Sequence, residues 1–243
     1  MITENSSYNQ EFLARFLMML TDEQKNHLLT SHVILFGVGG VGGSVAKMLV
    51  RSGIQNLAIV DFDNIDVSNI NRQVVANANN LGKIKVEELA LQLKEINPFV
   101  NIEKFNIKLS QETIDKFNLA KYDYIIDCID DLPAKKLLIL TAKTLKKPIL
   151  CAMGAGNRFE GIPAFEIADI KKTSYDPIAK ILRKFCAEQR INKLDVCYTK
   201  QKATKFDCKI IGSVIYYTMN MATVMCAKVI NDILRGNNES NNN

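Results

Sequence analysis

Glycines and one aspartate in the first third of the chain could bind a nucleotide. Gly37-Val38-Gly39-Gly40-Val41-Gly42 fits G-x-G-x-x-G, a pattern in which glycines let the backbone approach a phosphate. The motif lies between an apolar run at 33–36 and a stretch at 41–51 that can form a helix, whose first amides donate to anions. Asp61 follows Gly42 by 19 residues and could bind ribose hydroxyls. A dehydrogenase that binds NAD would share these features, so the kind of nucleotide stays open.

Two cations and a set of carboxylates favour the cleavage of a triphosphate. Arg72 stands in a polar cluster at 68–73, and Lys85 lies in the first turn of a helix predicted over 83–96. Hydride transfer does not need such cations, whereas phosphoryl transfer builds negative charge on oxygens that cations stabilise. Asp130 follows a strand predicted over 122–127, at the sheet edge where it could hold magnesium. Asp131 could share that ion or cap a helix, and Asp63 could shape its loop or bind metal or ribose.

The order and spacing of these motifs resemble a known adenylating superfamily. Gly-x-Gly-Gly-Val-Gly, Asp-Phe-Asp, Ser-Asn-x-x-Arg-Gln, Gly-x-x-Lys and Asp-Cys-x-Asp, all within 33–156, are similar to the ubiquitin-activating type (ThiF/MoeB/HesA-like). The resemblance implies that a substrate carboxylate attacks the α-phosphorus of ATP, which gives an acyl-adenylate and pyrophosphate. It assigns catalysis to Arg72, Lys85 and Asp130, and Mg²⁺ to Asp130. The implied ATP-binding residues are Gly37, Gly39, Gly40, Gly42, Asp61, Asp63, Asn69, Arg72, Gln73, Lys85 and Asp130.

The second half of the chain indicates one branch of that superfamily. Gly154-Ala155-Gly156-Asn157, the segments 168–173 and 176–183, and Asp195-Val196-Cys197-Tyr198-Thr199-Lys200 resemble the tRNA threonylcarbamoyladenosine dehydratases. That resemblance implies ATP-dependent cyclisation of threonylcarbamoyladenosine in the tRNA anticodon loop, a homodimer, and a cysteine desulfurase or sulfur acceptor as partner. The alternative is an activator of a ubiquitin-like sulfur carrier. The absence of any C-x-x-C pair argues against that alternative.

The elements that must position these residues alternate between strand and helix. Apolar runs at 33–36 and 57–60 predict strands, further strands are expected at 100–105, 122–127 and 148–151, and helices are expected over 41–51, 83–96 and 133–145. This order predicts a doubly wound, Rossmann-like α/β fold with a mostly parallel sheet and a C-terminal α+β extension. We expect a helical segment at 1–32, broken near a cap at Thr21, an adenylation core at 33–156, a branch-specific region at 157–235 and a polar tail at 236–243.

Positive charge is concentrated in the branch-specific region. The chain has 243 residues and a net charge of +5, and residues 163–209 hold 11 Lys/Arg against 6 Asp/Glu, a difference of five. The rest of the chain is therefore neutral, which indicates an anionic partner such as RNA, or else a merely solvated basic face. The family resemblance implies that this partner is tRNA and not DNA. The lysines and arginines that we expect to contact tRNA phosphates are Lys171, Lys172, Arg183, Lys184, Arg190 and Lys193.

Three further features leave alternatives open. Arg15 stands about three residues too early for the N-terminal arginine that the superfamily presents to ATP, so its role is undecided. Cys186 could carry sulfur, although an inert thiol is the favoured interpretation. The uncharged stretch 210–227 favours a buried or subunit-interface helix over a membrane span, because polar residues interrupt it. No basic N-terminal signal region is evident, and we expect a cytoplasmic protein.

Overall fold

One mixed sheet of seven strands forms the centre of the protein. The computed structural model describes residues 8–207 and 210–236, so Cys208, Lys209 and most of the predicted tail lie outside the described residues. The strand order is β3-β2-β1-β4-β5-β7-β6, and only β6 runs antiparallel to its neighbour. The strands are β1 (His32–Phe36), β2 (Asn56–Val60), β3 (Asn101–Phe105), β4 (Tyr124–Asp127), β5 (Ile149–Ala152), β6 (Phe165–Asp169) and β7 (Asp195–Thr199). The predicted doubly wound α/β class is confirmed.

The central strands form because their side chains can be buried on both faces. Four residues of β1 and four of β2 are buried, and all residues of β4 and β5 are buried. Continuous apolar runs of this kind suit a parallel sheet that is covered by helices on both sides. β3 lies at one edge and is largely exposed, which is consistent with the polar residues Asn101, Glu103 and Lys104 in its sequence.

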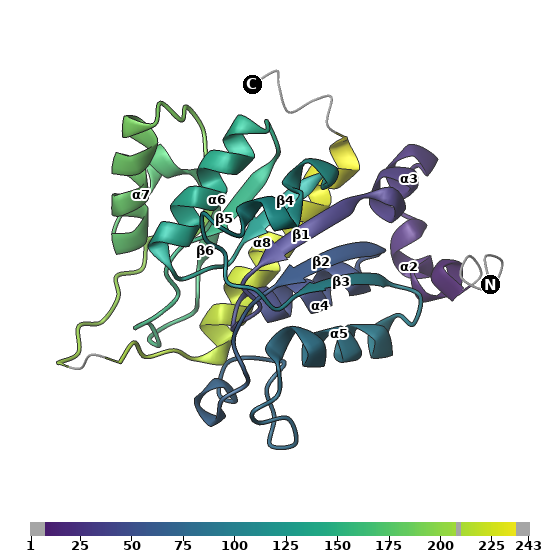
Figure 1. The fold of residues 1–243 in the computed structure, drawn as a ribbon, viewed down its shortest axis with the longest axis horizontal. Coiled ribbons are helices and arrows are strands. Elements are labelled where there is room, and N and C mark those ends of the chain that lie inside the picture. The colour runs from purple at the N-terminus through teal and green to yellow at the C-terminus, as the bar shows by residue number, and fades with distance from the viewer. Residues whose placement is uncertain (1–7, 208–209, 237–243) are drawn as a thin grey trace.

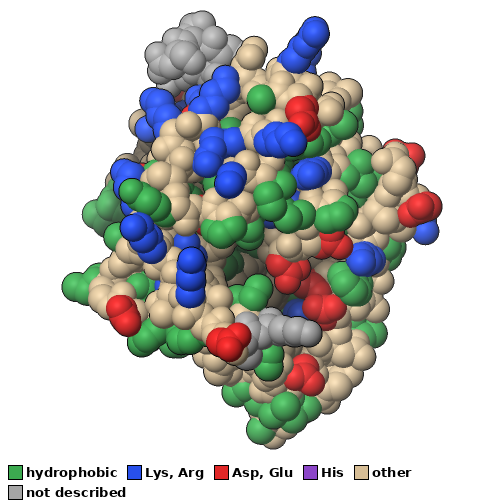
Figure 2. Space-filling model, turned by 90° about the vertical axis from the view of Figure 1, so that its left-hand side faces the viewer, with side chains coloured by type: hydrophobic (Ala, Val, Ile, Leu, Met, Phe, Trp, Pro, Cys, Tyr) green, Lys and Arg blue, Asp and Glu red, His purple; other side chains and the backbone are tan. Residues whose placement is uncertain are grey.

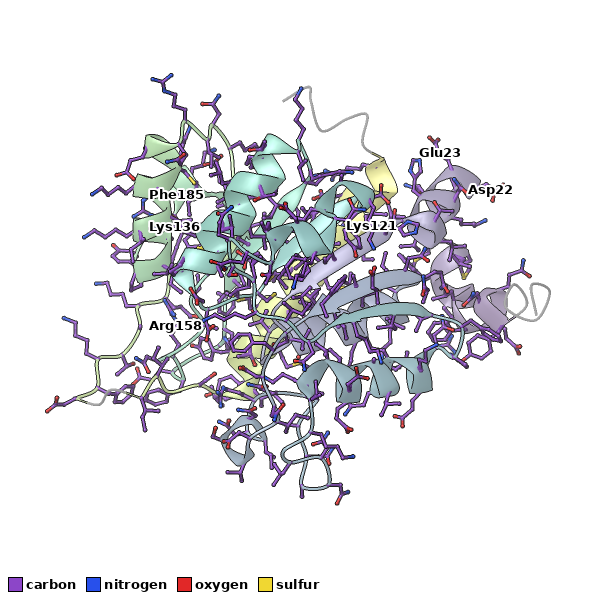
Figure 3. All side chains as sticks on the ribbon, in the orientation of Figure 1. Asp22, Glu23, Lys121, Lys136, Arg158 and Phe185 are labelled. Atoms are coloured by element: carbon purple, nitrogen blue, oxygen red, sulfur yellow. The ribbon has the colours of Figure 1, made fainter. Side chains whose placement is uncertain are left out.

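Helices cover both faces of the sheet (Figure 1). One face packs against α3 (Asp22–Thr30), α4 (Gly42–Arg51), α5 (Lys85–Ile96) and α8 (Ile215–Arg235). The other face packs against α6 (Leu132–Thr144) and α7 (Pro177–Glu188). The ammonium group of Lys136 on α6 lies 5.6 Å from the ring centre of Phe185 on α7, so these two helices are also joined at their surface (Figure 3).

The N-terminal helical segment differs in detail from the sequence prediction. The helical segment that was expected before the cap at Thr21 is interrupted: residues 8–12 are helical, the backbone turns at Leu13, and α2 (Ala14–Leu17) follows as one short turn. Leu13 is buried, and its Cδ1 atom lies beside Gly53, which also borders Leu28. The predicted cap at Thr21 is present, because its side chain accepts from the Gln24 amide in a reciprocal capping box.

The uncharged C-terminal stretch is only partly helical, which corrects the expectation for 210–227. Helix α8 begins at Ile215 and ends at Arg235, and residues 210–214 form no helix. Ile210 and Ile211 are 79% and 71% exposed, whereas one face of α8 is buried against the sheet. Among the described residues, no helix combines the length and apolar character that crossing a membrane requires.

Parallel topology brings the chemically interesting loops to one edge. The loops after β1, β2, β4 and β5 all leave from carboxyl ends of neighbouring strands, and such an edge is where doubly wound sheets bind ligands. These loops carry the glycine motif, Asp61, Asp130 and the segment 153–158. Three short 3-10 turns, η2 (Ile114–Phe117), η3 (Leu119–Lys121) and η4 (Ile170–Lys172), lie elsewhere in connecting segments.

Candidate functional site

A cleft of about 650 Å³ lies at this carboxyl edge. A volume in this range suits a nucleotide-sized ligand. Figure 2 shows a hollow in the face that carries α7, with lysines and arginines gathered above it and acidic side chains to its right. Of the predicted ATP-binding residues, the cleft is lined by Gly37, Gly39, Gly40, Asp61, Asp63, Arg72, Gln73, Lys85 and Asp130. Gly42 and Asn69 do not line it.

The glycine motif forms the floor of the cleft and the start of α4. Gly37 has φ +80°, and a side chain there would come within 2.7 Å of the Cys128 carbonyl oxygen. Gly42 is glycine for packing, because an added Cβ would lie 1.8 Å from the Gly37 carbonyl oxygen. Gly42 therefore allows the loop to pack closely against its own backbone. This explains why the sequence pattern includes Gly42 although it does not line the cleft.

Gln73 provides a buried polar atom that no described residue satisfies. Its side chain is 8% exposed and faces Gly39, whose added Cβ would be 3.7 Å from the Gln73 Nε2 atom. Its Oε1 atom has no hydrogen-bond partner within the described ranges. A buried unsatisfied oxygen is costly, so one that lines a cleft beside a glycine loop fits a ligand that donates to it.

The side chain of Lys85 is buried at the cleft, and its ammonium group forms ion pairs with two carboxylates. Although 2% exposed, it lines the cleft, with Nζ 3.1 Å from Asp63 Oδ2 and 3.8 Å from Asp61 Oδ1. The other Asp61 oxygen, Oδ2, accepts from the Val38 amide at 2.8 Å. Asp61 thus connects the glycine loop with the buried lysine, and phosphates entering the cleft would meet a cation that is already positioned.

Arg72 and Asn69 occupy the polar turn next to the glycine loop. Arg72 Nη1 donates to the Ser68 carbonyl and to Asn71 Oδ1, and Arg72 lines the cleft three residues after the end of η1 (Val67–Asn69). Asn69 is buried, and its Oδ1 atom accepts from the Asp66 amide in a capping box. In this arrangement, Asn69 builds the turn that carries Arg72.

Two exposed carboxylates line the cleft: Asp63, which pairs with Lys85, and Asp130, which is available for a metal ion. Asp130 lines the cleft and is exposed. Asp131 caps α6 by accepting from the Ala134 amide and lies 3.6 Å from Lys108 Nζ. Among residues 8–207 and 210–236 there is no group of three His, Cys, Asp or Glu side chains that could bind a metal. Mg²⁺ nevertheless fits, because it commonly uses one or two carboxylates together with substrate phosphates.

A buried ion pair lies beneath this carboxylate. Lys135 and Asp127 are both 0% exposed, with Lys135 Nζ 2.7 Å from Asp127 Oδ2. Lys135 also donates to the Ala152 carbonyl, and Asp127 Oδ1 accepts from the Ile129 amide. Burial alone would lower the pKa of Lys135, but the Asp127 charge outweighs it and the pKa is raised. The pair therefore joins the ends of β4 and β5 below Asp130.

Several residues that line the cleft were missed by sequence reasoning. Arg158, Asn157, Lys108 and Thr218 line it, although the sequence analysis gave none of them a role. Arg158 had one usable signal, since it is a cation that directly follows a glycine-containing loop after a predicted strand. Arg15 is exposed on α2 and does not line the cleft of its own chain.

The described cysteines have the properties of packing residues. Cys151, Cys186, Cys197 and Cys226 are buried, and Cys128 is partly buried. Burial raises the pKa of the Cys186 thiol, and it does the same for Cys128 next to Asp127. Raised thiol pKa values reduce the thiolate fraction on which nucleophilic reactivity depends.

The predicted basic residues lie around α7. Lys171 and Lys172 on η4 are exposed, as are Lys184, Arg190 and Lys193. Arg183 is half-buried, and its Nη1 donates to the Thr173 carbonyl and hydroxyl oxygens. Figure 2 shows positive side chains spread over this face above the hollow. Arg183 thus connects α7 to the preceding loop. Among the described residues, the side chains of the other five predicted lysines and arginines make no such hydrogen bond to the backbone.

Comparison with known proteins places the chain in a family. The profile of the ThiF family matches residues 13–243. The chain belongs to the ThiF family. Among curated relatives, a tRNA threonylcarbamoyladenosine dehydratase of Bacillus subtilis is 36% identical over 68% of this chain and 65% of its own length. A molybdopterin-synthase adenylyltransferase of Haemophilus influenzae is 29% identical over 74% of this chain and 72% of its own.

A solved structure confirms the fold of this ThiF-family chain. The tRNA N6-threonylcarbamoyladenosine dehydratase of E. coli in complex with ATP superposes with a TM-score of 0.86, covering 93% of this chain and 95% of that one. The sequence identity is 23%, so the likeness concerns architecture. The matched region spans just under two thirds of the length of the B. subtilis relative.

Proposed function

We propose that this protein is an ATP-dependent tRNA threonylcarbamoyladenosine dehydratase. The observation that carries the proposal is the cleft, where a glycine loop, an unsatisfied glutamine oxygen, Arg72 and the buried Lys85 converge at the carboxyl ends of β1 and β2. The relatives of that name support the choice of substrate. In the proposed division of labour, residues 33–156 bind and cleave ATP, and residues 157–235 bind tRNA.

In the proposed reaction, AMP takes the place of hydroxide as the leaving group, and AMP leaves far more easily. A carboxylate oxygen of the threonyl group forms a bond to the α-phosphorus of ATP while the bond to pyrophosphate breaks. A nitrogen of the same modification then attacks the acyl carbon, loses its proton, and expels AMP together with the former carboxylate oxygen. Lys85 and Arg72 stabilise the negative charge that develops on phosphoryl oxygens. A magnesium ion held by Asp130 would supply additional positive charge there.

The proposed reaction is tested by the mass of the modified nucleoside. The purified protein is incubated with Mg²⁺, ATP and tRNA that carries threonylcarbamoyladenosine, and the released nucleosides are weighed. We expect an ATP-dependent loss of about 18 mass units, the mass of one water. An unchanged nucleoside beside intact ATP binding would favour the second candidate, a carrier-protein activator, which the molybdopterin-synthase relative supports.

The metal proposal predicts a shift in the magnesium requirement. Asp130→Asn removes the exposed carboxylate after β4, so the Mg²⁺ concentration for half-maximal activity should rise about tenfold, as expected for the loss of one charge-assisted contact. Asp131→Asn is the matched control, because asparagine also caps helices and the Asp131 carboxylate is occupied with α6. Equal magnesium titrations for Asp130→Asn and wild type would remove Asp130 from the set of ligands.

The tRNA proposal predicts a change in salt dependence. Lys171→Gln with Lys172→Gln removes two exposed charges from the basic face, and each lost phosphate contact should reduce the slope of log K against log salt by about one. The measurement is filter binding of tRNA between low and moderate salt. Lys94→Gln, an exposed lysine on α5 at the opposite face of the sheet, is the control. An unaltered slope in the double variant would identify the basic face as merely solvated.

Exposed apolar side chains support the proposed homodimer. Ile162, Ile210 and Ile211 are 86%, 79% and 71% exposed, and Ile215 and Tyr216 at the start of α8 are half-exposed. Apolar groups in contiguous segments are typical of protein interfaces. A cytoplasmic location and a cysteine desulfurase partner remain proposals that rest on the family.

A further inference from the structure

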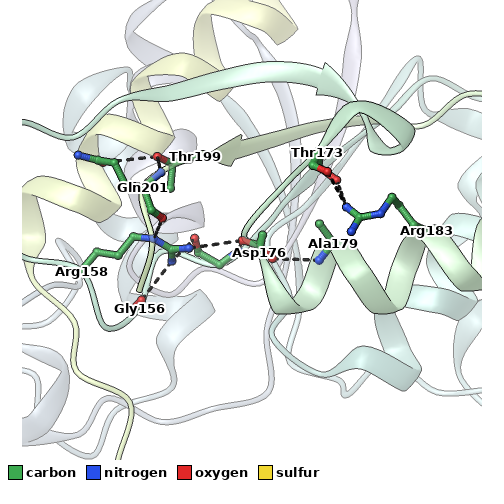
Figure 4. Close-up of polar contacts among 9 residues, drawn as sticks. Gly156, Arg158, Thr173, Asp176, Ala179, Arg183, Thr199 and Gln201 are labelled. Atoms are coloured by element: carbon green, nitrogen blue, oxygen red, sulfur yellow. Dashed lines mark hydrogen bonds and ion pairs between the residues drawn. The ribbon is translucent and has the colours of Figure 1, made fainter. Parts of the chain in front are cut away.

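Arg158 is a buried cation with an unused hydrogen-bond donor at one end of the cleft. It is 5% exposed and lines the cleft. Its Nε donates to the Gln201 carbonyl at 2.9 Å, and its Nη1 donates to the carbonyls of Gly154 and Gly156 at 3.0 and 3.2 Å. Its Nη2 has no hydrogen-bond partner in the described part of the chain. Figure 4 shows the guanidinium enclosed by these groups.

The nearby carboxylate does not satisfy this donor. Asp176 Oδ2 lies 3.9 Å from Arg158 Nη2, beyond hydrogen-bond distance. That same oxygen accepts from the Gly154 amide at 3.0 Å, and Asp176 Oδ1 accepts from the Ala179 amide as the cap of α7. Asp176 therefore forms an ion pair with Arg158, drawn as a dashed line in Figure 4, while its hydrogen bonds go to backbone amides. A buried donor left without a partner costs free energy, so its presence at a cleft wall points to a ligand that accepts.

The order of the strands places Arg158 beyond the nucleotide. Asp61 follows β2, the glycine loop follows β1, Asp130 follows β4, and Arg158 lies in the loop after β5. Neighbouring strands are about 4.8 Å apart, so the β2 and β5 ends are separated by roughly 14 Å. If the ribose lies at β2 and the phosphates over β1 and β4, the β5 end is the next free part of the cleft. The acceptor of the adenylyl group must enter there.

We propose that Arg158 binds the carboxylate of the acyl substrate before adenylation, through its Nη2 donor. This assignment rests on the proposed function, and it identifies the substrate carboxylate as the group that is bound at the β5 end of the cleft. Guanidinium groups suit carboxylates because of charge and matching geometry. The carboxylate loses its negative charge when it becomes an acyl-adenylate, so Arg158 holds the substrate more strongly than the intermediate. Its removal should therefore raise the KM for tRNA without lowering kcat.

A pair of ligands that differ only in charge tests the assignment. Free N6-threonylcarbamoyladenosine and its carboxamide are titrated calorimetrically into the full chain in the presence of a non-hydrolysable ATP analogue. The wild type should bind the acid about tenfold or more tightly than the amide, as expected for a charged hydrogen bond. Arg158→Met should lose this preference, and Arg158→Lys, which keeps the charge, should retain part of it. Arg51→Met, at the exposed end of α4, should behave as wild type.

The alternatives give different results. An undiminished preference for the acid in Arg158→Met would overturn the assignment. So would a parallel loss of affinity for the ATP analogue, because Arg158 would then only support the loop 153–158. Equal binding of acid and amide by the wild type would overturn the assignment and leave the proposed function standing. Binding of neither compound by the wild type would contradict the proposed function itself, and the assignment with it.

Discussion

Replacing Lys85 by methionine should reduce ATP–pyrophosphate exchange by about a thousandfold while the protein stays folded. The Lys85 ammonium is buried beneath the cleft, 3.1 Å from Asp63 and 3.8 Å from Asp61, so its position is fixed before ATP arrives. A prepositioned charge at developing phosphoryl charge contributes about a hundredfold to a thousandfold. Asp63 is half-exposed, so water can solvate its carboxylate once the lysine is gone. Asp61, whose side chain is 10% exposed, keeps the Val38 and Asp63 amides as hydrogen-bond donors.

Lys83→Met is the matched control for that prediction. Lys83 stands two residues earlier, is exposed, and pairs with Glu88 at 3.2 Å, away from the carboxylates that Lys85 meets. Exchange should stay within about twofold of wild type, because exposed ion pairs contribute little. Arg72→Ala should behave like Lys85→Met. Normal exchange in both Lys85→Met and Arg72→Ala, with unchanged thermal unfolding, would contradict the triphosphate assignment.

Replacing Lys135 by methionine should lower the free energy of unfolding by about 3–5 kcal/mol. The substitution leaves the Asp127 carboxylate fully buried with no cation, and an uncompensated buried charge is strongly destabilising. It also removes the donor to the Ala152 carbonyl at the end of β5. Urea unfolding at a fixed protein concentration measures the loss.

Lys136→Met separates this effect from a general effect of losing a lysine on α6. Lys136 is half-buried, and its ammonium lies over the Phe185 ring (Figure 3), so the variant should lose no more than about 1 kcal/mol. If Lys135→Met unfolded at the same urea concentration as Lys136→Met, the buried pair would not be holding the ends of β4 and β5 together.

Local patterns were sufficient to predict the fold and to single out the glycine loop, Asp61, Arg72 and Lys85, which the structure brings together at one cleft. Fully apolar runs such as 33–36 identify buried parallel strands, and the glycine motif between strand and helix needs only neighbouring residues to be interpreted. Lys85 was predicted from its place in a first helical turn. Its burial was not, because it depends on Asp61 and Asp63 folding back over it from the end of β2.

The remainder depends on contacts between distant residues. The role of Arg158 follows from carbonyls at 154, 156 and 201 that only the folded chain brings together. Lys135 looks like an ordinary surface lysine in the sequence, and its burial depends on Asp127 at the end of β4. The start of α8 was misplaced because residues 210–214 are as uncharged as the helix that follows, so composition does not mark the boundary.

The most direct test of the account follows one oxygen atom. Threonylcarbamoyladenosine in tRNA is labelled with ¹⁸O in its carboxylate, and the protein is supplied with Mg²⁺ and unlabelled ATP. Attack of the carboxylate on the α-phosphorus predicts one ¹⁸O atom in the released AMP and a nucleoside lighter by one labelled water. Dehydrated nucleoside beside unlabelled AMP, or label in orthophosphate with ADP as the product, would contradict adenylation as the step that drives cyclisation.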